Sequence, residues 1–292
     1  MTLSIVVPVH KEPFLDKTIN SILGNAVEDI EIFPVLDGFV PSYPISDDPR
    51  VKPIKLEHIG MRGAINAGIS AATGKYLMKC DSHCSFAPGF DKVLIDNLEE
   101  DWIVIPRRYS LDEISWDRIE NGRIKDYHYI TFPKQTSWGL GIYPMEWKRR
   151  GLEAVEIDDT MTFQGSCWLA DRKYFMEHVG LLDDKHYSPF GGEQLEIGLK
   201  YWLGGGQVKV NKKTWYAHLR KTMHHYNSHM YSTMHKRDAG AIAGHEWSAK
   251  HWMGNEEPNM IHKFEWLVEK FWPVPTWPAE RTLWVYPGKT NS

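Results

Sequence analysis

The chain has 292 residues, 42% of them hydrophobic and 25% charged, a composition that predicts one large folded domain or two closely packed ones. Its net charge of −4, with histidine counted as neutral, argues against a protein whose whole surface binds nucleic acid. The three cysteines give no disulfide framework, and the sequence shows neither a charged leader nor a run near the ~20 apolar residues of a membrane span, so we expect a soluble cytoplasmic protein.

Strand and helix patterns alternate over the first part of the chain. Leu3 to Val9 is a β-branched run that predicts a buried parallel strand. Phe14 to Leu23 places apolar side chains at helical spacing, and Gly24 follows as a stop signal. Further strands are predicted at 30–36, 51–56, 75–80 and 102–105, and further helices at 62–72 and 90–98.

This alternation is typical of βαβ units, and it predicts an α/β fold with a mainly parallel sheet flanked by helices. Ligands of such sheets bind beyond the carboxyl ends of the strands. Asp37 and Asp81 each stand at the end of a predicted strand. Both carboxylates are therefore candidates for a ligand site at that edge of the sheet.

The alternation ends after Pro106. The following segment is polar and aromatic, and Asn121-Gly122 predicts a hairpin turn. The last part of the chain is predicted to be helical, then extended and rich in Pro and Trp from Trp272. Between these parts, strands are predicted at 160–170 and 208–215, and a helix at 193–203.

The triplet Asp81-Ser82-His83 predicts a metal site. In an extended chain, residues two apart point to the same side, so the carboxylate and the imidazole could hold one cation. That ligand pair suits Mn²⁺ or a similar ion, whereas sets made only of oxygen suit Mg²⁺ or Ca²⁺. A zinc site made by Cys80, His83 and Cys84 is an alternative, although this spacing is tight for a closed tetrahedral site.

Four segments resemble, in the same order, the catalytic domain of the polypeptide N-acetylgalactosaminyltransferases, which belong to the wider GT-A glycosyltransferases. The resemblance covers roughly residues 3–226 and implies a GT-A, Rossmann-like fold. The segments are SIVVPVHKEP with Leu36-Asp37-Gly38, residues 79–84 as an Asp-x-His-Cys box, residues 160–175, and residues 190–197 as a close match to a Trp-Gly-Gly-Glu-Asn-Leu-Glu box.

The resemblance also implies a division of the chain. Residues 1–106 would form the half that binds the nucleotide-sugar. Residues 107–230 would form the acceptor-binding half of the same GT-A domain. Residues 231–292 would then be a C-terminal helical and Trp/Pro-rich extension.

A metal centre of three side chains follows from the same resemblance. Asp81 and His83 would supply two ligands, and His218, in the segment YAHLRK after a Gly-Gly turn, would supply the third. The implied ion is Mn²⁺, with Mg²⁺ as the alternative. It would bridge the diphosphate of a UDP-sugar and act as a Lewis acid on the leaving nucleotide.

The remaining site residues are implied in the same way. Glu193 would be the acidic residue nearest the transferred sugar or the acceptor hydroxyl, where it would position the sugar or act as a general base. Asp37 would contact the uridine, and Arg62 would substitute for a family arginine that is Ile65 here. The full set of implied donor-binding residues is Pro8, Asp37, Arg62, Ser82, Gly165, Gly192, Arg220, Lys221 and Tyr226.

Several residues around the implied sugar pocket differ from the family pattern. Phe190 replaces Trp, Gln194 replaces Asn, and Gln164-Gly165-Ser166 replaces Ala-Gly-Gly. These differences leave the transferred sugar and a protein acceptor undetermined.

The predicted function is metal-dependent transfer of a sugar from a UDP-sugar to a hydroxyl acceptor, a glycan or a protein, and the resemblance implies retention of configuration. A transferase acting on hydroxymethylated bases in DNA is an alternative, which the basic and His-rich stretch 211–251 favours and the net charge disfavours. A non-catalytic module that binds nucleotide-sugars or glycans is a second alternative, and a zinc-dependent hydrolase is a third.

Overall fold

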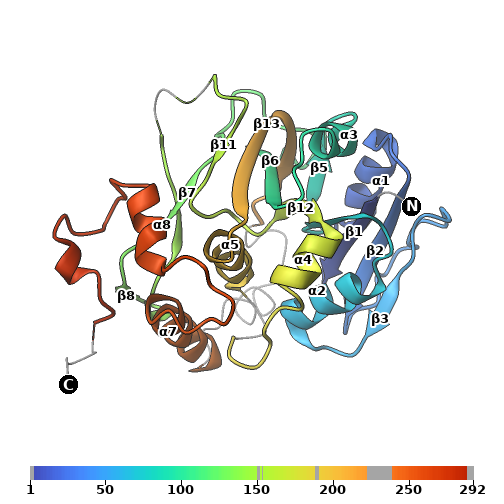
Figure 1. The fold of residues 1–292 in the computed structure, drawn as a ribbon. Helices are drawn as coiled ribbons and strands as arrows, with labels where there is room; N and C mark the ends of the chain where they lie inside the picture. The colour runs from blue at the N-terminus through green and yellow to red at the C-terminus, as the bar shows by residue number, and fades with distance from the viewer. Residues whose placement is uncertain (1–2, 150–151, 153, 188–190, 222–238, 288–292) are drawn as a thin grey trace.

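The computed structural model describes residues 3–149, 152, 154–187, 191–221 and 239–287. Within these residues the main sheet has nine strands, in the order β11-β13-β6-β12-β4-β1-β2-β3, with β5 paired to β13. Helices pack on both sides of this sheet, and the C-terminal helices lie at the end of the molecule away from β1–β3 (Figure 1). The predicted α/β fold with flanking helices is confirmed.

The N-terminal half follows the sequence prediction closely. β1 pairs in parallel with both β2 and β4, and β2 pairs in parallel with β3. Almost every residue of β1 and β2 is buried. Parallel strands that are covered on both faces need such apolar runs, and this explains why these segments form inner strands of the sheet. The elements are β1 (Leu3–Val9), α1 (Leu15–Asn25), β2 (Ile30–Asp37), β3 (Ile54–Leu56), α2 (Gly60–Ala71), β4 (Tyr76–Cys80) and α3 (Phe90–Ile95).

Antiparallel strands interrupt the parallel sheet at its centre. β12 (Cys167–Asp171) lies between β4 and β6 and runs antiparallel to both. It is shorter than the predicted strand 160–170, because residues 160–166 leave the sheet and approach the site. β5 (Cys84–Phe86) was not predicted, because three residues are too few to show the alternation of apolar and polar side chains that marks a strand.

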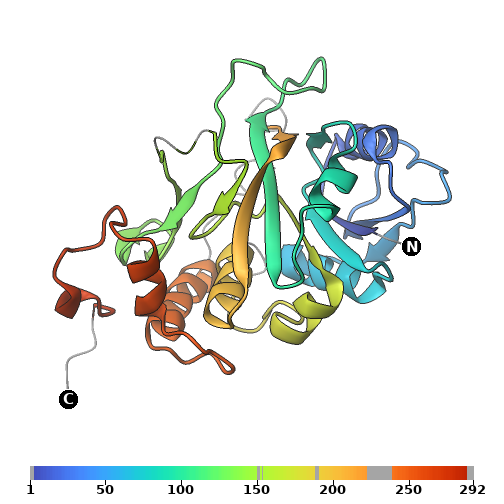
Figure 2. The same ribbon diagram turned by 45° about the horizontal axis from the view of Figure 1, so that its top comes forward.

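Two long strands carry the chain from the sheet to the candidate site. β6 (Trp102–Ser110) and β13 (Gln207–His218) pair in parallel side by side, with a register shift between Asn211 and Trp215 (Figure 2). Both run beyond the predicted strands, since the backbone pairing continues where the apolar pattern ends at Arg107. The register therefore brings His218 opposite Ser110.

The helices after β12 begin at clear local signals. The Asp171 carboxylate accepts a hydrogen bond from Tyr174 N at 3.1 Å and caps the next helix. Gly192, with φ of +77°, allows the backbone turn that starts the helix at Glu193. The remaining elements are β7 (His128–Ile130), β8 (Lys134–Thr136), β9 (Gly139–Gly141), β10 (Pro144–Glu146), β11 (Ile157–Asp159), α4 (Arg172–His178), α5 (Glu193–Leu203), α7 (Ala239–Met253), α8 (Phe264–Lys270) and a 3₁₀ turn (Arg281–Leu283).

The tryptophan excess is explained in large part by packing. Trp168, Trp202 and Trp252 are among the largest fully buried side chains. In the C-terminal segment, Trp277 is buried and donates from its indole N–H to the backbone oxygen of Ile130 at 2.8 Å. Trp168 packs in the core against Phe175, Trp277 docks the C-terminal segment onto the body of the protein, and none of these four buried rings is free to stack on a sugar.

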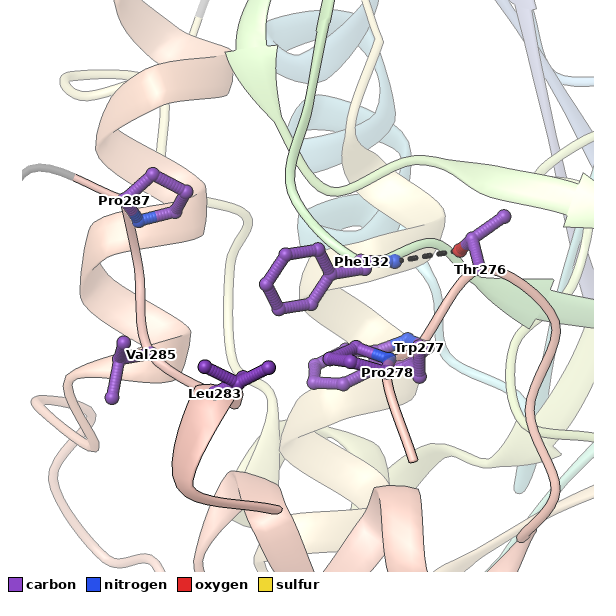
Figure 3. Close-up of a pocket in the computed structure, with 7 residues that line it drawn as sticks. All are labelled: Phe132, Thr276, Trp277, Pro278, Leu283, Val285 and Pro287. Atoms are coloured by element: carbon purple, nitrogen blue, oxygen red, sulfur yellow. Dashed lines mark hydrogen bonds between the residues drawn. The ribbon is translucent and has the colours of Figure 1, made fainter. Parts of the chain in front are cut away.

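A cavity of about 580 Å³ lies beside the C-terminal segment (Figure 3). Phe132 donates from its backbone N–H to the hydroxyl of Thr276 at 2.9 Å across one wall. The lining side chains are apolar apart from that threonine, so this cavity offers no acid, base or metal ligand: Phe132, Thr276, Trp277, Pro278, Leu283, Val285 and Pro287. Within the described residues, no helix is both long and apolar enough to cross a membrane.

Candidate metal centre

Three potential metal ligands meet at the carboxyl ends of the central strands. Asp81 follows β4, His83 lies in the turn after it, and His218 is the last residue of β13. Oδ2 of Asp81 is 3.0 Å from Nε2 of His218 and 4.0 Å from Nε2 of His83. The antiparallel pairing of β13 with β5 causes this convergence, because it sets His218 opposite Cys84.

The Asp81 carboxylate is held in its ionised form. Burial works against ionisation, but the Lys79 ammonium and the hydrogen bond from His218 hold the pKa of Asp81 well below its ordinary value. The Nζ atom of Lys79 lies 2.5 Å from Oδ1 of Asp81, so Oδ2 faces the two imidazoles. Asp81 therefore presents a charged oxygen to a cation at neutral pH.

The two imidazoles differ in how they are held. Burial lowers the pKa of His218 to about 3, although the hydrogen bond to Asp81 opposes this shift, so the ring is neutral as a metal ligand must be. Nδ1 of His83 lies 3.1 Å from Oε2 of Glu12. A ring N–H donated to a carboxylate fixes the tautomer that leaves the other nitrogen free for a metal. Glu12 thus orients His83 with Nε2 toward Asp81.

The three ligand atoms fit one divalent cation. They lie within 4.8 Å of one another, and they combine one carboxylate with two imidazoles. Such a mixed oxygen and nitrogen set suits Mn²⁺ or a similar transition metal better than Mg²⁺ or Ca²⁺. A bound ion would be held by Asp81, His83 and His218.

The alternative zinc site does not form among the described residues. The groups of ligand atoms that converge there include neither Cys80 nor Cys84. Both thiols are buried, and burial raises the pKa of each, so neither presents the thiolate that binds zinc. Cys167 is also buried and free, and all three cysteines pack in the core.

The predicted catalytic residue, Glu193, is linked to Asp81 through Lys79 and Gly165. Glu193 is the first residue of α5 and is 6% exposed, and its Oε2 atom has no hydrogen-bond partner among the described residues. A Cβ atom on residue 165 would overlap the Glu193 carboxylate, so a side chain there would force the Glu193 carboxylate to move. The backbone oxygen of Gly165 accepts a hydrogen bond from Lys79 at 2.7 Å. Lys79 therefore joins Asp81 to the segment that faces Glu193.

Asp37 occupies the second predicted strand end, at the end of β2. Its carboxylate accepts hydrogen bonds from the backbone N–H groups of Ile59 at 2.6 Å and Gly60 at 3.0 Å, and so caps α2. His58 bonds to the same carboxylate at 2.9 Å, and His10 stacks on His58 with ring centroids 4.4 Å apart. This pair of imidazoles was not predicted, and it places a second polar group at the same edge of the sheet.

Arg62 does not face an open site. Its guanidinium is fully buried, forms an ion pair with Glu196, and donates to the backbone oxygen of Asp183 at 2.9 Å. It also lies 4.0 Å from the ring centroid of Tyr187. These contacts join α2 to the start of α5 and occupy the guanidinium, and the expected contact of Arg62 with the donor stays a prediction.

The other predicted donor-binding residues divide by position. Ser82 is buried between the two ligands of its triplet, and Lys221 donates to Oε2 of Glu12 at 2.7 Å. Arg220 is exposed next to Lys221. Pro8 is half-buried near the end of β1, Gly192 precedes α5, and Tyr226 lies outside the described residues.

Besides His58, four side chains near Asp81 or Asp37 were missed by the sequence analysis. Lys79 could have been found as a charged residue inside an apolar strand, which buried strands rarely contain without a partner. Glu12 follows the first strand directly, at the edge where ligands bind. Arg108 and His10 gave no signal, because their roles depend on pairing between distant segments.

The mixed α/β sheet, with a carboxylate and two imidazoles at its strand ends, defines a GT-A-like fold with a candidate metal centre. Residues 4–179 match glycosyl transferase family 2. The match covers more than half of the chain, which therefore belongs to this family. The resemblance found from the sequence is confirmed.

Curated relatives agree with this assignment. The human polypeptide N-acetylgalactosaminyltransferase 9 is 31% identical over 165 residues, which cover 55% of this chain and 26% of that protein. The Caenorhabditis elegans polypeptide N-acetylgalactosaminyltransferase 5 is 25% identical over 230 residues, which cover 71% of this chain and 35% of that protein. The chain thus spans only about a quarter to a third of the length of these relatives.

Solved structures share the fold at low sequence identity. GalNAc-T7, crystallised with UDP, GalNAc and Mn²⁺, superposes with a TM-score of 0.66 at 18% identity, covering 87% of this chain and 49% of that one. The S. aureus protein TarS, residues 1–349 in complex with UDP-GlcNAc, gives a TM-score of 0.50 at 14% identity, covering 80% of this chain and 61% of that one. Both likenesses concern the fold.

Proposed function

We propose that this protein transfers a sugar from a UDP-sugar to a hydroxyl acceptor, with Mn²⁺ held by Asp81, His83 and His218. The observation that carries the proposal is the convergence of these ligands from segments about 135 residues apart, at the sheet edge where ligands of this fold class bind. Membership in glycosyl transferase family 2 supports it. The GalNAc-T7 structure with UDP, GalNAc and Mn²⁺ supports the choice of donor and ion.

The chain's own residues divide the work around the donor. When bound, the ion supplies Lewis-acid stabilisation of the charge that develops on the leaving diphosphate. Lys221 and His83 both bond to the Glu12 carboxylate, so Lys221 lies close to the metal ligands. Lys221 and the exposed Arg220 are proposed to bind phosphate oxygens by charge-assisted hydrogen bonds. Asp37, at the end of β2, is proposed to orient the uridine from the same edge.

Glu193 is proposed to act at the sugar. Its unpartnered Oε2 atom is a buried acceptor, and a buried polar atom without a partner is costly unless a ligand supplies one. A sugar or acceptor hydroxyl would satisfy it. The likeness to polypeptide N-acetylgalactosaminyltransferases supports retention of configuration, which ¹H NMR of the freshly formed product would test.

A cytoplasmic location stays a prediction. Its support is chemical: Cys80, Cys84 and Cys167 are free and buried, as in proteins of a reducing compartment.

The test is UDP release from a panel of UDP-sugars, with Mn²⁺ or with excess chelator. We expect release only with the ion, and a loss of at least about 100-fold in Asp81→Asn, because that variant weakens both ion binding and transition-state stabilisation. Asp96→Asn, at the exposed C-terminal cap of α3 and outside both groups of convergent ligands, is the matched control. Full activity in chelator or in Asp81→Asn contradicts the proposal.

A further inference from the structure

Arg108 is a buried cation beside the metal centre. It is 8% exposed, and its NH2 atom lies 2.9 Å from Nδ1 of His218. Its Nε atom has no hydrogen-bond partner among the described residues, and none of their carboxylates lies within ion-pair distance. A buried guanidinium without an anion is costly, so its position indicates that a ligand supplies the missing acceptor.

Metal ligation changes what Arg108 can bind. An imidazole that ligates a cation through Nε2 carries its proton on Nδ1. A guanidinium has donors only and cannot bond to that N–H. His218 therefore cannot accept a hydrogen bond from Arg108 at Nδ1 while its Nε2 atom ligates an ion. When an ion binds, the Arg108 donors lose this acceptor and are open to another one.

Lys125 adds a second cation of the same kind. It pairs with Arg108 through an antiparallel bridge, its backbone N–H donating to the Arg108 oxygen at 3.0 Å. Burial lowers the pKa of Lys125, and the positive charge of Arg108 lowers it further. Its nearest carboxylate, Glu146, is 4.0 Å away and is held by Arg123 at 2.6 Å. Positive charge thus exceeds negative charge here.

Space for a ligand lies beside Lys125, whereas its bridge partner Arg108 does not line this space. A cavity of about 250 Å³ is open in front of Lys125, with the Tyr127 and Trp147 rings among its walls. Arg107 also lines it, but its guanidinium is neutralised by Asp126 at 2.8 Å. Lys125 is a partly buried lining cation that is 4.0 Å from its nearest carboxylate and is bridged through the backbone to Arg108. Arg149 also lines the cavity, but it does not adjoin Arg108 and lies 3.9 Å from Asp158.

The donor does not need these two cations. Each phosphate of a UDP-sugar carries one negative charge, so a divalent ion alone balances the diphosphate, and Arg220 and Lys221 supply further positive charge for it. Arg108 and Lys125 lie on the β6 side of His218, toward the 107–149 segment, and not on the Glu12 side with Lys221. Arg220 adjoins this positive group, because its charge also lowers the pKa of Lys125.

We infer that Arg108 and Lys125 bind an oxyanion, a phosphate or a carboxylate, carried by the acceptor close to its reacting hydroxyl. The inference rests on the proposed function and names the chemical class of its acceptor. Both oxyanions match a guanidinium, which forms paired charge-assisted hydrogen bonds with either. The two sources are separated by experiment.

The test measures binding of three small probes to protein loaded with Mn²⁺ and UDP: glycerol 3-phosphate, glycerate and glycerol. They share a carbon skeleton and differ in the anion. We expect one or both anions to bind at least tenfold more tightly than glycerol, and the preferred anion identifies the source. Lys125→Ala should reduce that preference at least tenfold, and Lys125→Arg should keep it. Lys173→Ala, an exposed lysine on α4, is the control for charge.

Three results overturn the inference. Equal binding of all three probes, or an undiminished anion preference in Lys125→Ala, shows that the cations do not recognise an acceptor anion. A drop in UDP affinity in Lys125→Ala, with no anion binding to the loaded protein, shows that they serve the donor diphosphate. The UDP titration with Mn²⁺ is measured first, because its failure contradicts the proposed function itself and not only this inference.

Discussion

The ammonium of Lys79 lies 2.5 Å from the Asp81 carboxylate, as a buried ion pair directly behind the candidate metal centre. Lys79 is 1% exposed, so its charge has little access to water. The burial of Lys79 opposes its ionisation, but Asp81 and then Glu193 raise its pKa, so both partners of the pair are charged. In the absence of a cation, Lys79 is the positive charge that keeps Asp81 ionised and in place.

Lys79→Met is expected to destabilise the metal-free protein much more than the Mn²⁺-loaded protein. Removing one partner of a buried pair leaves the other charge uncompensated, at a cost of about 3 kcal/mol. A bound divalent ion replaces that positive charge and reduces the loss. Urea denaturation in chelator and in saturating Mn²⁺ measures both values, with Lys173→Met as the exposed control. Equal losses in the two conditions would show that Lys79 acts by packing alone.

Glu12→Gln is expected to weaken Mn²⁺ binding by about 10- to 100-fold, the usual effect of removing a carboxylate that orients a ligating histidine. Glu12 holds His83 at 3.1 Å and Lys221 at 2.7 Å, so the change also releases Lys221. Calorimetric titration with Mn²⁺ gives the affinity. Glu31→Gln is the matched control, since Glu31 is also buried and ion-paired, with Lys52 at 2.8 Å, but lies outside both groups of convergent ligands.

The sequence was sufficient to predict the N-terminal half of the fold. The strands β1, β2 and β4 are mostly apolar runs, each interrupted by one polar residue, Ser4, Glu31 or Lys79, and each followed or closed by a polar residue. Asp81 and His83 could be found because they are neighbours in the chain. His218 could be assigned only by resemblance, since nothing local marks it among 14 histidines.

The remaining features depend on contacts between distant segments. The polar end of β6, with Arg107 and Arg108, has no strand pattern, and only its pairing with β13 keeps it in the sheet. Arg62 was expected at the donor only through the resemblance, and its ion pair with Glu196, 134 residues away, leaves no local trace in the sequence. The register of the strands decides which side chains meet at this site. Hydrophobic patterning specifies that register within the core but not at the polar strand ends.

Gly165→Ala is expected to lower both stability and transfer, because the added Cβ overlaps the Glu193 carboxylate. Forcing an extra methyl into a packed site costs about 1–3 kcal/mol. The shorter Glu193→Asp should relieve the overlap, so the double variant should recover stability without recovering transfer. A double-mutant cycle of unfolding free energies measures this coupling. Additive losses would show that the two residues do not touch in solution.

Acid stability offers a test of the buried His128. Burial, and then the positive charges of Arg108 and Lys125, lower its pKa to about 3 from 6.5. Between these pH values the unfolded chain binds a proton that the folded chain does not, so this stability is complete above pH 6.5 and is lost as the pH falls toward 3. The loss should reach roughly 3 kcal/mol at pH 4.

His128→Gln should therefore make the decline of the unfolding free energy between pH 6.5 and pH 4 shallower. At pH 7 the variant should lose less unfolding free energy than the wild type loses between pH 7 and pH 4. His178→Gln, at an exposed position on α4, is the control and should leave the decline in place. Urea denaturation at pH 7, 6, 5 and 4 in the presence of chelator gives the curves without a metal contribution. An unchanged slope in His128→Gln would assign the acid sensitivity to other buried groups, because the folded protein would then take up a proton at residue 128 as easily as the unfolded chain does.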